Sequence, residues 1–375
     1  MKPTLKMFSS FFVLLALGLA LHGSVTHSPT TSDSSGCYRV ALQAPDKGLA
    51  PLWISSATWI DSTSEVGVVD PWQNTIFLYS ETGVPRVLEP ATLQQSDKSF
   101  FPASIEATRS GYLVKMVDQR TLWLDQSLNL KRQENLAKAS GGPRGEIGAL
   151  YDLTVAGEYF LAFGSVKQLR STKHRFGFFR APLREPSKFD FLLEDTYVDF
   201  YLLGHDYLGA LGRDAYFVLM KDEAAIYRVP ASGRARIEKL NAFPKGYARV
   251  PALPVSTGPT SDEALYQAIE GQTLAVGLYG QDFLYLLTRE PSASNQGTVW
   301  YLHQIDPRSD KVLGKMRLPT AANHLAVAVA PQAWYFFERG PVLGLSQQKV
   351  PTMLVVPTEL IKSRSVPSTC PTRQR

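Results

Sequence analysis

Short apolar runs separated by turn residues recur along this chain, and this repetition constrains the fold more than any other feature. In the first unit, residues 66–70 (VGVVD) lead through a four-residue turn into residues 75–79 (TIFLY), and a turn containing glycine follows. The same order of runs and turns returns from about residues 98, 147, 200, 270 and 322. Strand-length runs at a period of about 40–50 residues are typical of a β-propeller.

The repeats predict an all-β fold, a six-bladed β-propeller with four-stranded antiparallel blades around a central channel. The second strand of each unit begins near residues 65, 112, 159, 215, 283 and 334. The runs are rich in Val, Ile, Leu, Tyr, Phe and Trp, which suits strands packed on both faces, and the turns carry Gly, Pro, Asp and Ser. Seven blades would result if residues 241–272 hide a further unit, and five blades is the other alternative.

The sixth unit has two candidates for its last strand, and they come from opposite ends of the chain. Its third strand is expected at residues 342–345, and its last strand at residues 353–356 or at residues 38–42. A propeller joins its first and last blades, so the ends of the repeated region meet. The only two cysteines, Cys37 and Cys370, stand at these ends. In an exported protein this placement predicts a disulfide, and a lipid anchor on Cys37 is the competing interpretation.

The N-terminus has the pattern of a secretory signal. Lys2 and Lys6 stand beside an apolar run over residues 7–21, and small and polar residues follow it. We therefore predict a signal peptide over 1–23, a flexible leader over 24–36, one propeller domain over 37–370 and a tail over 371–375. The mature chain is expected to be exported, either secreted or periplasmic. An uncleaved N-terminal anchor is the alternative, although the run is shorter than the roughly 20 residues that span a membrane.

The charge balance argues against nucleic acid as a partner. The formal net charge of the whole chain is +5, and removing Lys2 and Lys6 leaves 37 basic against 34 acidic residues, a net charge of +3. Such a small and scattered excess is not the footprint of a nucleic-acid surface. No second long apolar run follows, so no membrane span is expected in the mature chain, and a monomer is expected.

The segment from Val69 to Gly83 carries a resemblance to known propellers. Asp70 follows the apolar Val69, Asn74 precedes the next strand, and Gly83 closes the turn. This order resembles the repeat of six-bladed propellers of the NHL and TolB-like kind, and the resemblance covers most of the mature chain as architecture. It implies that ligands meet the face made by the loops entering each inner strand and the loops joining each second and third strand. We call this the upper face.

Charged, polar and aromatic residues in those loops are the predicted ligand-binding residues. They are Asp70, Trp72, Asp118, Arg120, Tyr151, Asp152, His205, Asp206, Asn323, His324 and Arg339. Asp70 and Asp118 recur at one position of the repeat, which favours a structural role in their turns. The first interpretation is therefore a ligand-binding or scaffold module with no chemistry of its own and no cofactor, whose partner is a protein, peptide or glycan. An assembly subunit of an enzyme complex is a further alternative.

The second interpretation is a metal-dependent hydrolase. Regucalcin- and gluconolactonase-like propellers hold a divalent cation in the channel and hydrolyse lactones or esters. The best ligands for calcium or zinc here are Asp152, His205, Asp206, Asn323 and His324. The competing interpretation is that the aspartates and the asparagine bond to local backbone. No G-x-S-x-G elbow, P-loop or dinucleotide pattern is present, so no catalytic residue is assigned. His303 lies within an apolar run and is expected to pack inside a blade.

Overall fold

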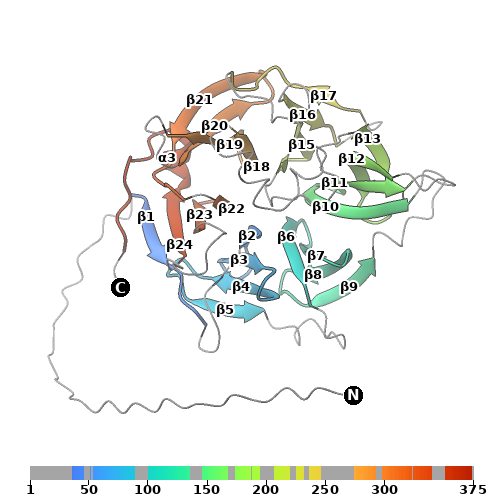
Figure 1. Cartoon of the computed structure of the whole chain (residues 1–375), viewed down its shortest axis with the longest axis horizontal. Helices are drawn as coiled ribbons and strands as arrows, with labels where there is room; N and C mark the ends of the chain where they lie inside the picture. The colour runs from blue at the N-terminus through green and yellow to red at the C-terminus, as the bar shows by residue number, and fades with distance from the viewer. Residues whose placement is uncertain are drawn as a thin grey trace, which may run out of the picture. The chain divides into compact units, whose positions relative to one another are not determined.

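Six antiparallel sheets of four strands follow one another around a ring (Figure 1), so the predicted six-bladed propeller is confirmed. The computed structural model describes residues 36–45, 51, 54–88, 100–135, 146–167, 174–186, 188–194, 207–219, 225–231, 236–245, 274–292, 298–322, 324–339 and 351–373. The predicted signal peptide and nearly all of the leader lie outside the described residues. No helix within the described ranges is long and apolar enough to cross a membrane.

In blades one to five the strands run in chain order from the channel to the rim. Blade one has β2 (Ser56–Ile60), β3 (Glu65–Asp70), β4 (Thr75–Tyr79) and β5 (Pro85–Leu88). Blade two has β6 (Pro102–Thr108), β7 (Gly111–Met116), β8 (Arg120–Asp125) and β9 (Leu130–Asn135). Blade three has β10 (Glu146–Ala156), β11 (Tyr159–Lys167), β12 (His174–Pro182) and β13 (Asp190–Glu194).

The next two blades keep the same order. Blade four has β14 (Leu208–Leu211), β15 (Asp214–Leu219), β16 (Ala225–Val229) and β17 (Glu238–Lys239). Blade five has β18 (Leu274–Gly280), β19 (Leu284–Pro291), β20 (Thr298–Asp306) and β21 (Lys311–Arg317). The sequence SDEALYQAI over residues 261–269 opens like a helix, and it lies outside the described residues.

Blade six is built from both ends of the chain. Its order from the channel is β22 (His324–Val329), β23 (Ala333–Arg339), β24 (Thr352–Pro357) and β1 (Tyr38–Ala41). The expected third strand at residues 342–345 was wrong, because β24 pairs directly with β23 and takes that place. Residues 342–345 lie outside the described ranges. Both candidates for the last strand are therefore used, β24 as the third strand and β1 as the fourth.

The core lies between neighbouring blades because the middle strands bury side chains on both faces. The ring of Phe178 in blade three stacks on that of Phe217 in blade four, with ring centroids 4.0 Å apart. Trp59 in blade one stacks on Tyr335 in blade six at 5.6 Å. Such aromatic pairs bury large areas and favour one geometry. This explains why the sequence is apolar along whole strands rather than alternating.

The seam of the ring is held by a disulfide and by the C-terminal segment. Cys37 and Cys370 are bonded, with Cα atoms 5.3 Å apart, as the sequence predicted. The main-chain N–H of Arg39 donates to the carbonyl of Pro371 at 2.8 Å, and Arg39 also forms a parallel bridge with Thr372. Residues 371–372, assigned to a tail from sequence, thus contact the outer edge of β1.

Candidate functional site: the upper face of blades one to three

Hydrogen bonds tie the upper loops of adjacent blades into one surface. The hydroxyl of Ser55 in blade one donates to the carbonyl of Ala103 in blade two at 2.7 Å. The N–H of Leu150 in blade three donates to the side-chain oxygen of Gln119 in blade two at 2.6 Å. Each bond joins an upper loop of one blade to the inner strand of the next, so residues on these loops keep fixed relative positions. The described residues cover more of the upper face in these blades than in the others.

Three large apolar side chains are exposed on this surface. Trp72 is 62% exposed, Val117 57% and Phe101 40%. The N–H of Val117 donates to the carbonyl of Phe101 at 2.8 Å, so these two residues are direct neighbours. Of the large apolar side chains that are exposed among the described residues, Trp72 and Phe101 are the aromatic ones. Exposed apolar surface of this kind marks contact sites, and Trp is enriched among residues that dominate binding energy.

Asp70 positions Trp72 rather than facing solvent itself. The Asp70 side chain is fully buried, and its carboxylate accepts N–H groups from Trp72 at 2.9 Å and Gln73 at 3.1 Å. Asn74 completes the turn with a φ of 53°, the left-handed region that Asn tolerates. The turn role expected for Asp70 is what the structure shows. Its buried carboxylate fixes the loop that presents the Trp72 ring.

Asp118 has the same turn role in blade two. Its carboxylate accepts the N–H of Arg120 at 3.2 Å and pairs with the Arg120 guanidinium at 2.6 Å. The Asp118 side chain is 41% exposed, whereas that of Arg120 is 11% exposed. Because Asp118 neighbours Val117 in the chain, the apolar group has a carboxylate at its side. Asp118 thus remains accessible to a partner, while Arg120 is largely enclosed.

Tyr151 and Asp152 lie on β10, the inner strand of blade three. The Tyr151 ring packs beside the rings of Phe163 and Phe176, with centroids 6.1 and 6.3 Å away. One carboxylate oxygen of Asp152 accepts the N–H of Leu153 at 2.8 Å. Asp152 therefore forms the hydrogen bond to local backbone that was the competing interpretation of its sequence position.

Lys115, which the sequence reasoning missed, joins blades two and three. Its ammonium donates to the carbonyls of Leu150, at 3.4 Å, and Tyr151. Burial lowers the pKa of Lys115, and the charges of Asp152 and Glu106 act in the opposite direction. In the sequence Lys115 is one polar residue inside an apolar strand, and nothing local signals that it reaches the next blade.

The side chains of the five remaining predicted site residues lie outside the part of the chain that the structure describes. His205, Asp206 and Asn323 lie outside it altogether, and for His324 and Arg339 only the main chain is described. Those two residues pair across β22 and β23 at the upper end of blade six. Within the part of the chain that the structure describes, no group of three or more His, Cys, Asp or Glu residues is arranged to hold a metal ion.

Comparisons with known proteins find likeness in fold but none in sequence. No family model and no curated protein sequence matches the chain. A gluconolactonase from Xanthomonas campestris is 12% identical, with 82% of this chain and 87% of that chain covered and a TM-score of 0.47. Regucalcin, a calcium-binding protein from Agrobacterium tumefaciens, is 10% identical over 87% and 95%, with a TM-score of 0.44. Virginiamycin B lyase from Staphylococcus aureus is 11% identical over 85% and 98%, with a TM-score of 0.41.

Proposed function

We propose that this chain is an exported β-propeller that binds a protein, peptide or glycan partner through its upper face and has no chemistry of its own. The observation that carries the proposal is the exposure of Trp72, Phe101 and Val117 on loops that are held in place. An exposed Trp ring stacks on sugars and fills pockets of protein partners equally well. The Asp118 carboxylate at the edge of this group supplies a polar contact beside it.

Export is supported by the disulfide as well as by the N-terminal pattern. Disulfides persist in oxidising compartments and are rare where thiols are kept reduced. The Cys37–Cys370 bond lies at the seam of the ring, where it would be maintained only in such a compartment. The proposed location is therefore the periplasm or the medium, after removal of residues 1–23.

The alternative is a metal-dependent lactonase or esterase with a cation in the channel. Asp152 is the proposed metal ligand whose side chain is described, and one of its oxygens already accepts the N–H of Leu153. Lys115 interacts electrostatically with the same carboxylate, so Asp152 already has two partners within the protein. This local arrangement favours the binding module over the hydrolase.

The proposal is tested by comparing Trp72→Ala with Val84→Ala. Val84 is also exposed, at 46%, but it lies between β4 and β5 on the opposite face. Each purified mature protein is immobilised and crosslinked to the envelope and secreted fractions of the source organism, and retained molecules are quantified by mass spectrometry and glycan analysis. We expect the wild type and Val84→Ala to retain the same partner.

The Trp72→Ala variant should retain this partner at least about 10-fold less, as truncation of a central Trp contact does. Fluorescence gives a second readout, because partner binding should protect the exposed Trp72 from iodide quenching. Equal retention by both variants would contradict the proposal. A partner lost by Val84→Ala and kept by Trp72→Ala would move the binding site to the opposite face.

A further inference from the structure

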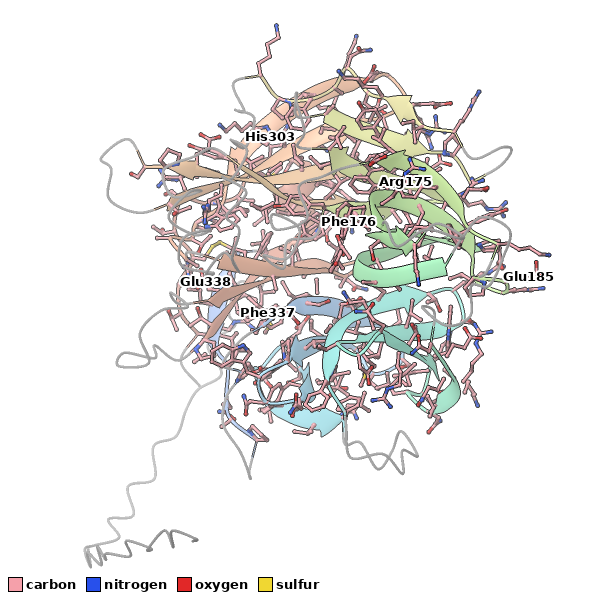
Figure 2. The ribbon with its side chains drawn as sticks, turned by 45° about the vertical axis from the view of Figure 1, so that its right-hand side comes forward. Arg175, Phe176, Glu185, His303, Phe337 and Glu338 are labelled. Carbon is pink, nitrogen blue, oxygen red and sulfur yellow. A yellow bond between two sulfur atoms is a disulfide. The ribbon has the colours of Figure 1, made fainter. Side chains whose placement is uncertain are left out.

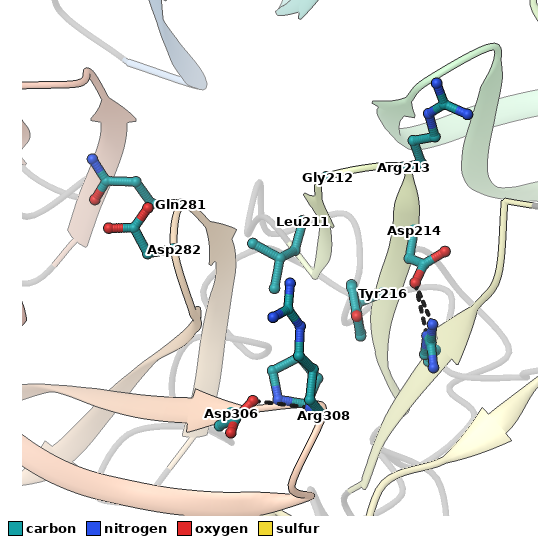
Figure 3. Close-up of a pocket in the computed structure, with 11 residues that line it drawn as sticks. Leu211, Gly212, Arg213, Asp214, Tyr216, Gln281, Asp282, Asp306 and Arg308 are labelled. Carbon is teal, nitrogen blue, oxygen red and sulfur yellow. Dashed lines mark hydrogen bonds and ion pairs between the residues drawn. The ribbon is translucent and has the colours of Figure 1, made fainter.

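A pocket of about 540 Å³ opens on the face opposite the upper face, where blades four and five meet (Figure 3). Its walls come from three hairpins, those joining β14 to β15, β18 to β19 and β20 to β21. Leu211 and Pro307 supply apolar wall, and Tyr216, Arg228 and Arg308 supply polar groups. A volume of this size suits a small molecule. The pocket is separate from the binding face described above.

Two of the pocket's aspartates are already engaged by protein donors. Asp214 pairs with the guanidinium of Arg228 at 2.6 Å and accepts the N–H of Ala231 at 2.9 Å. Asp306 accepts the main-chain N–H of Arg308 at 2.9 Å and the hydroxyl of Ser309 at 2.7 Å. Both oxygens of each carboxylate therefore have donors. These groups fix the hairpins and leave little capacity to bind a ligand cation.

The third aspartate is also compensated. Asp282 pairs with the ammonium of Lys362, on the C-terminal helix α3 (Thr358–Lys362), at 2.6 Å. The neighbouring Gln281 accepts the indole N–H of Trp334 and donates to the carbonyl of Ala330. The blade-five side of the pocket is thus tied to blade six and to the C-terminal segment. It forms a wall with its hydrogen bonds already made.

The guanidinium of Arg308 differs from these groups because it has no hydrogen-bond or ion-pair partner among the described residues. Figure 3 shows it extending from its hairpin towards Leu211 and Tyr216. Tyr216 is 3% exposed, and burial, followed by the charge of Asp214, raises its pKa to about 12. The Tyr216 hydroxyl therefore keeps its proton at neutral pH and can donate it. The charges of Arg228 and Arg308 act on this phenol in the opposite direction.

We propose that this pocket binds a small monocarboxylate, held by the Arg308 guanidinium with a further hydrogen bond from the Tyr216 hydroxyl. The planar fork of a guanidinium matches the two oxygens of a carboxylate. The Arg308 guanidinium carries one positive charge, which a single carboxylate neutralises, so a singly charged carboxylate is expected to bind in preference to a dianion such as phosphate. Leu211 and Pro307 would contact the carbon skeleton. This site lies on the opposite face and does not depend on the partner proposed above.

Benzoate is the probe, because it joins one carboxylate to an apolar ring. Isothermal titration calorimetry measures its binding to the mature protein at fixed ionic strength, with sodium chloride as the reference and sodium phosphate as the competing anion. Arg308→Gln should weaken benzoate binding at least about 10-fold, since it removes a charge-assisted pair. Tyr216→Phe should weaken it about 3- to 10-fold through loss of one hydrogen bond.

Arg317→Gln is the matched control, because Arg317 is exposed on the rim strand β21 and has no ion pair among the described residues. It should bind benzoate as the wild type does, and so should Trp72→Ala, which separates this site from the upper face. Unchanged binding in Arg308→Gln, or no benzoate binding by the wild type, would overturn the proposal. Phosphate binding tighter than benzoate binding would overturn the preference for a monocarboxylate.

Discussion

The guanidinium of Arg39, on the outermost strand of blade six, contacts the carboxylate of Glu338 two strands further in, at 3.3 Å. Thr352, on the strand between them, also donates its hydroxyl to Glu338. Arg39 further donates to the carbonyls of Cys370, at 2.9 Å, and Pro319. One N-terminal side chain thus links the outer strand, the second strand and the C-terminal segment; Glu338 is labelled in Figure 2.

Replacing Arg39 by Ala should lower the free energy of unfolding by about 2–3 kcal/mol, because Glu338 would keep its charge in a largely enclosed place. The side chains of Arg39 and Glu338 are 21% and 13% exposed. Urea unfolding measures the change. The control is Lys188→Ala, which breaks the pair with Glu185 on the surface of blade three, where the side chains are 69% and 55% exposed, and should cost only about 0–1 kcal/mol. Equal losses in the two variants would show that Arg39 has no special role at the seam.

Reducing the disulfide should destabilise the ring by about 2–5 kcal/mol, the usual range for a native disulfide. The bond closes a loop with a sequence separation of 333 residues, so it restricts the unfolded chain strongly. Hydrogen exchange followed by mass spectrometry should show faster exchange in β1 and β24 than in blades two and three after reduction. Uniform acceleration in all blades would mean that the seam is not where the ring opens first.

His303 should make stability fall between neutral and acidic pH. Burial, followed by the charge of Lys315, lowers the pKa of His303 from 6.5 to about 4, and its ring accepts or donates a hydrogen bond with Thr288 at 3.1 Å. The unfolded chain therefore binds a proton at higher pH than the folded chain does. The contribution is complete above about pH 6.5 and is lost as the pH falls towards about 4, a total of about 3 kcal/mol.

Urea unfolding at pH 7, 6 and 5 measures this slope for the wild type, His303→Gln and Thr288→Val. The His303→Gln variant should lose that part of the slope, whereas Thr288→Val removes the hydrogen bond without removing the titrating ring and should keep it. His303 is 3% exposed within blade five (Figure 2), so the expectation that it packs inside a blade is confirmed. A wild-type slope that survives in His303→Gln would assign the pH dependence to other groups.

Chelation should leave the melting temperature of the mature protein unchanged. The physical reason is that the Asp152 carboxylate already interacts with Lys115 and accepts the N–H of Leu153. Elemental analysis of protein purified without chelator, with thermal melts before and after EDTA, measures this directly. A stoichiometric divalent metal together with a lowered melting temperature would favour the hydrolase and direct attention to lactone and ester substrates.

Most strands could be predicted because each is a continuous apolar run bounded by turn residues. Residues 66–70 and 75–79, for example, were expected as strands and match β3, to within one residue, and β4. The strand order of blade six was harder to predict, because three short apolar runs, residues 38–42, 342–345 and 353–356, were candidates for its third and fourth strands. The choice depends on pairing between residues over 300 positions apart, which no local pattern encodes. The sequence therefore showed that the ends meet, but not which strand takes which place.

The site was less predictable than the fold. Asp70, Asp118 and Trp72 could be found because they sit in a repeated turn whose hydrogen bonds are local. Phe101 and Val117 were missed, although a large apolar residue in the turn directly before or after a strand is a usable signal. The pocket around Arg308 was not predictable, because its walls come from hairpins of two blades. Their proximity is set by blade packing and has no counterpart in residue spacing.

The construction of blade six also sets an order of events during folding. Blades one to five consist of strands that pair with their neighbours in the chain, so they can form from short-range contacts as the polypeptide emerges. Strand β1 emerges before all of them, yet its partner β24 is among the last segments to appear. It must wait for nearly the whole chain, and its pairing is the step that completes the molecule. A polypeptide that stopped before Thr352 would leave β23 as an open edge, ready to pair with another chain.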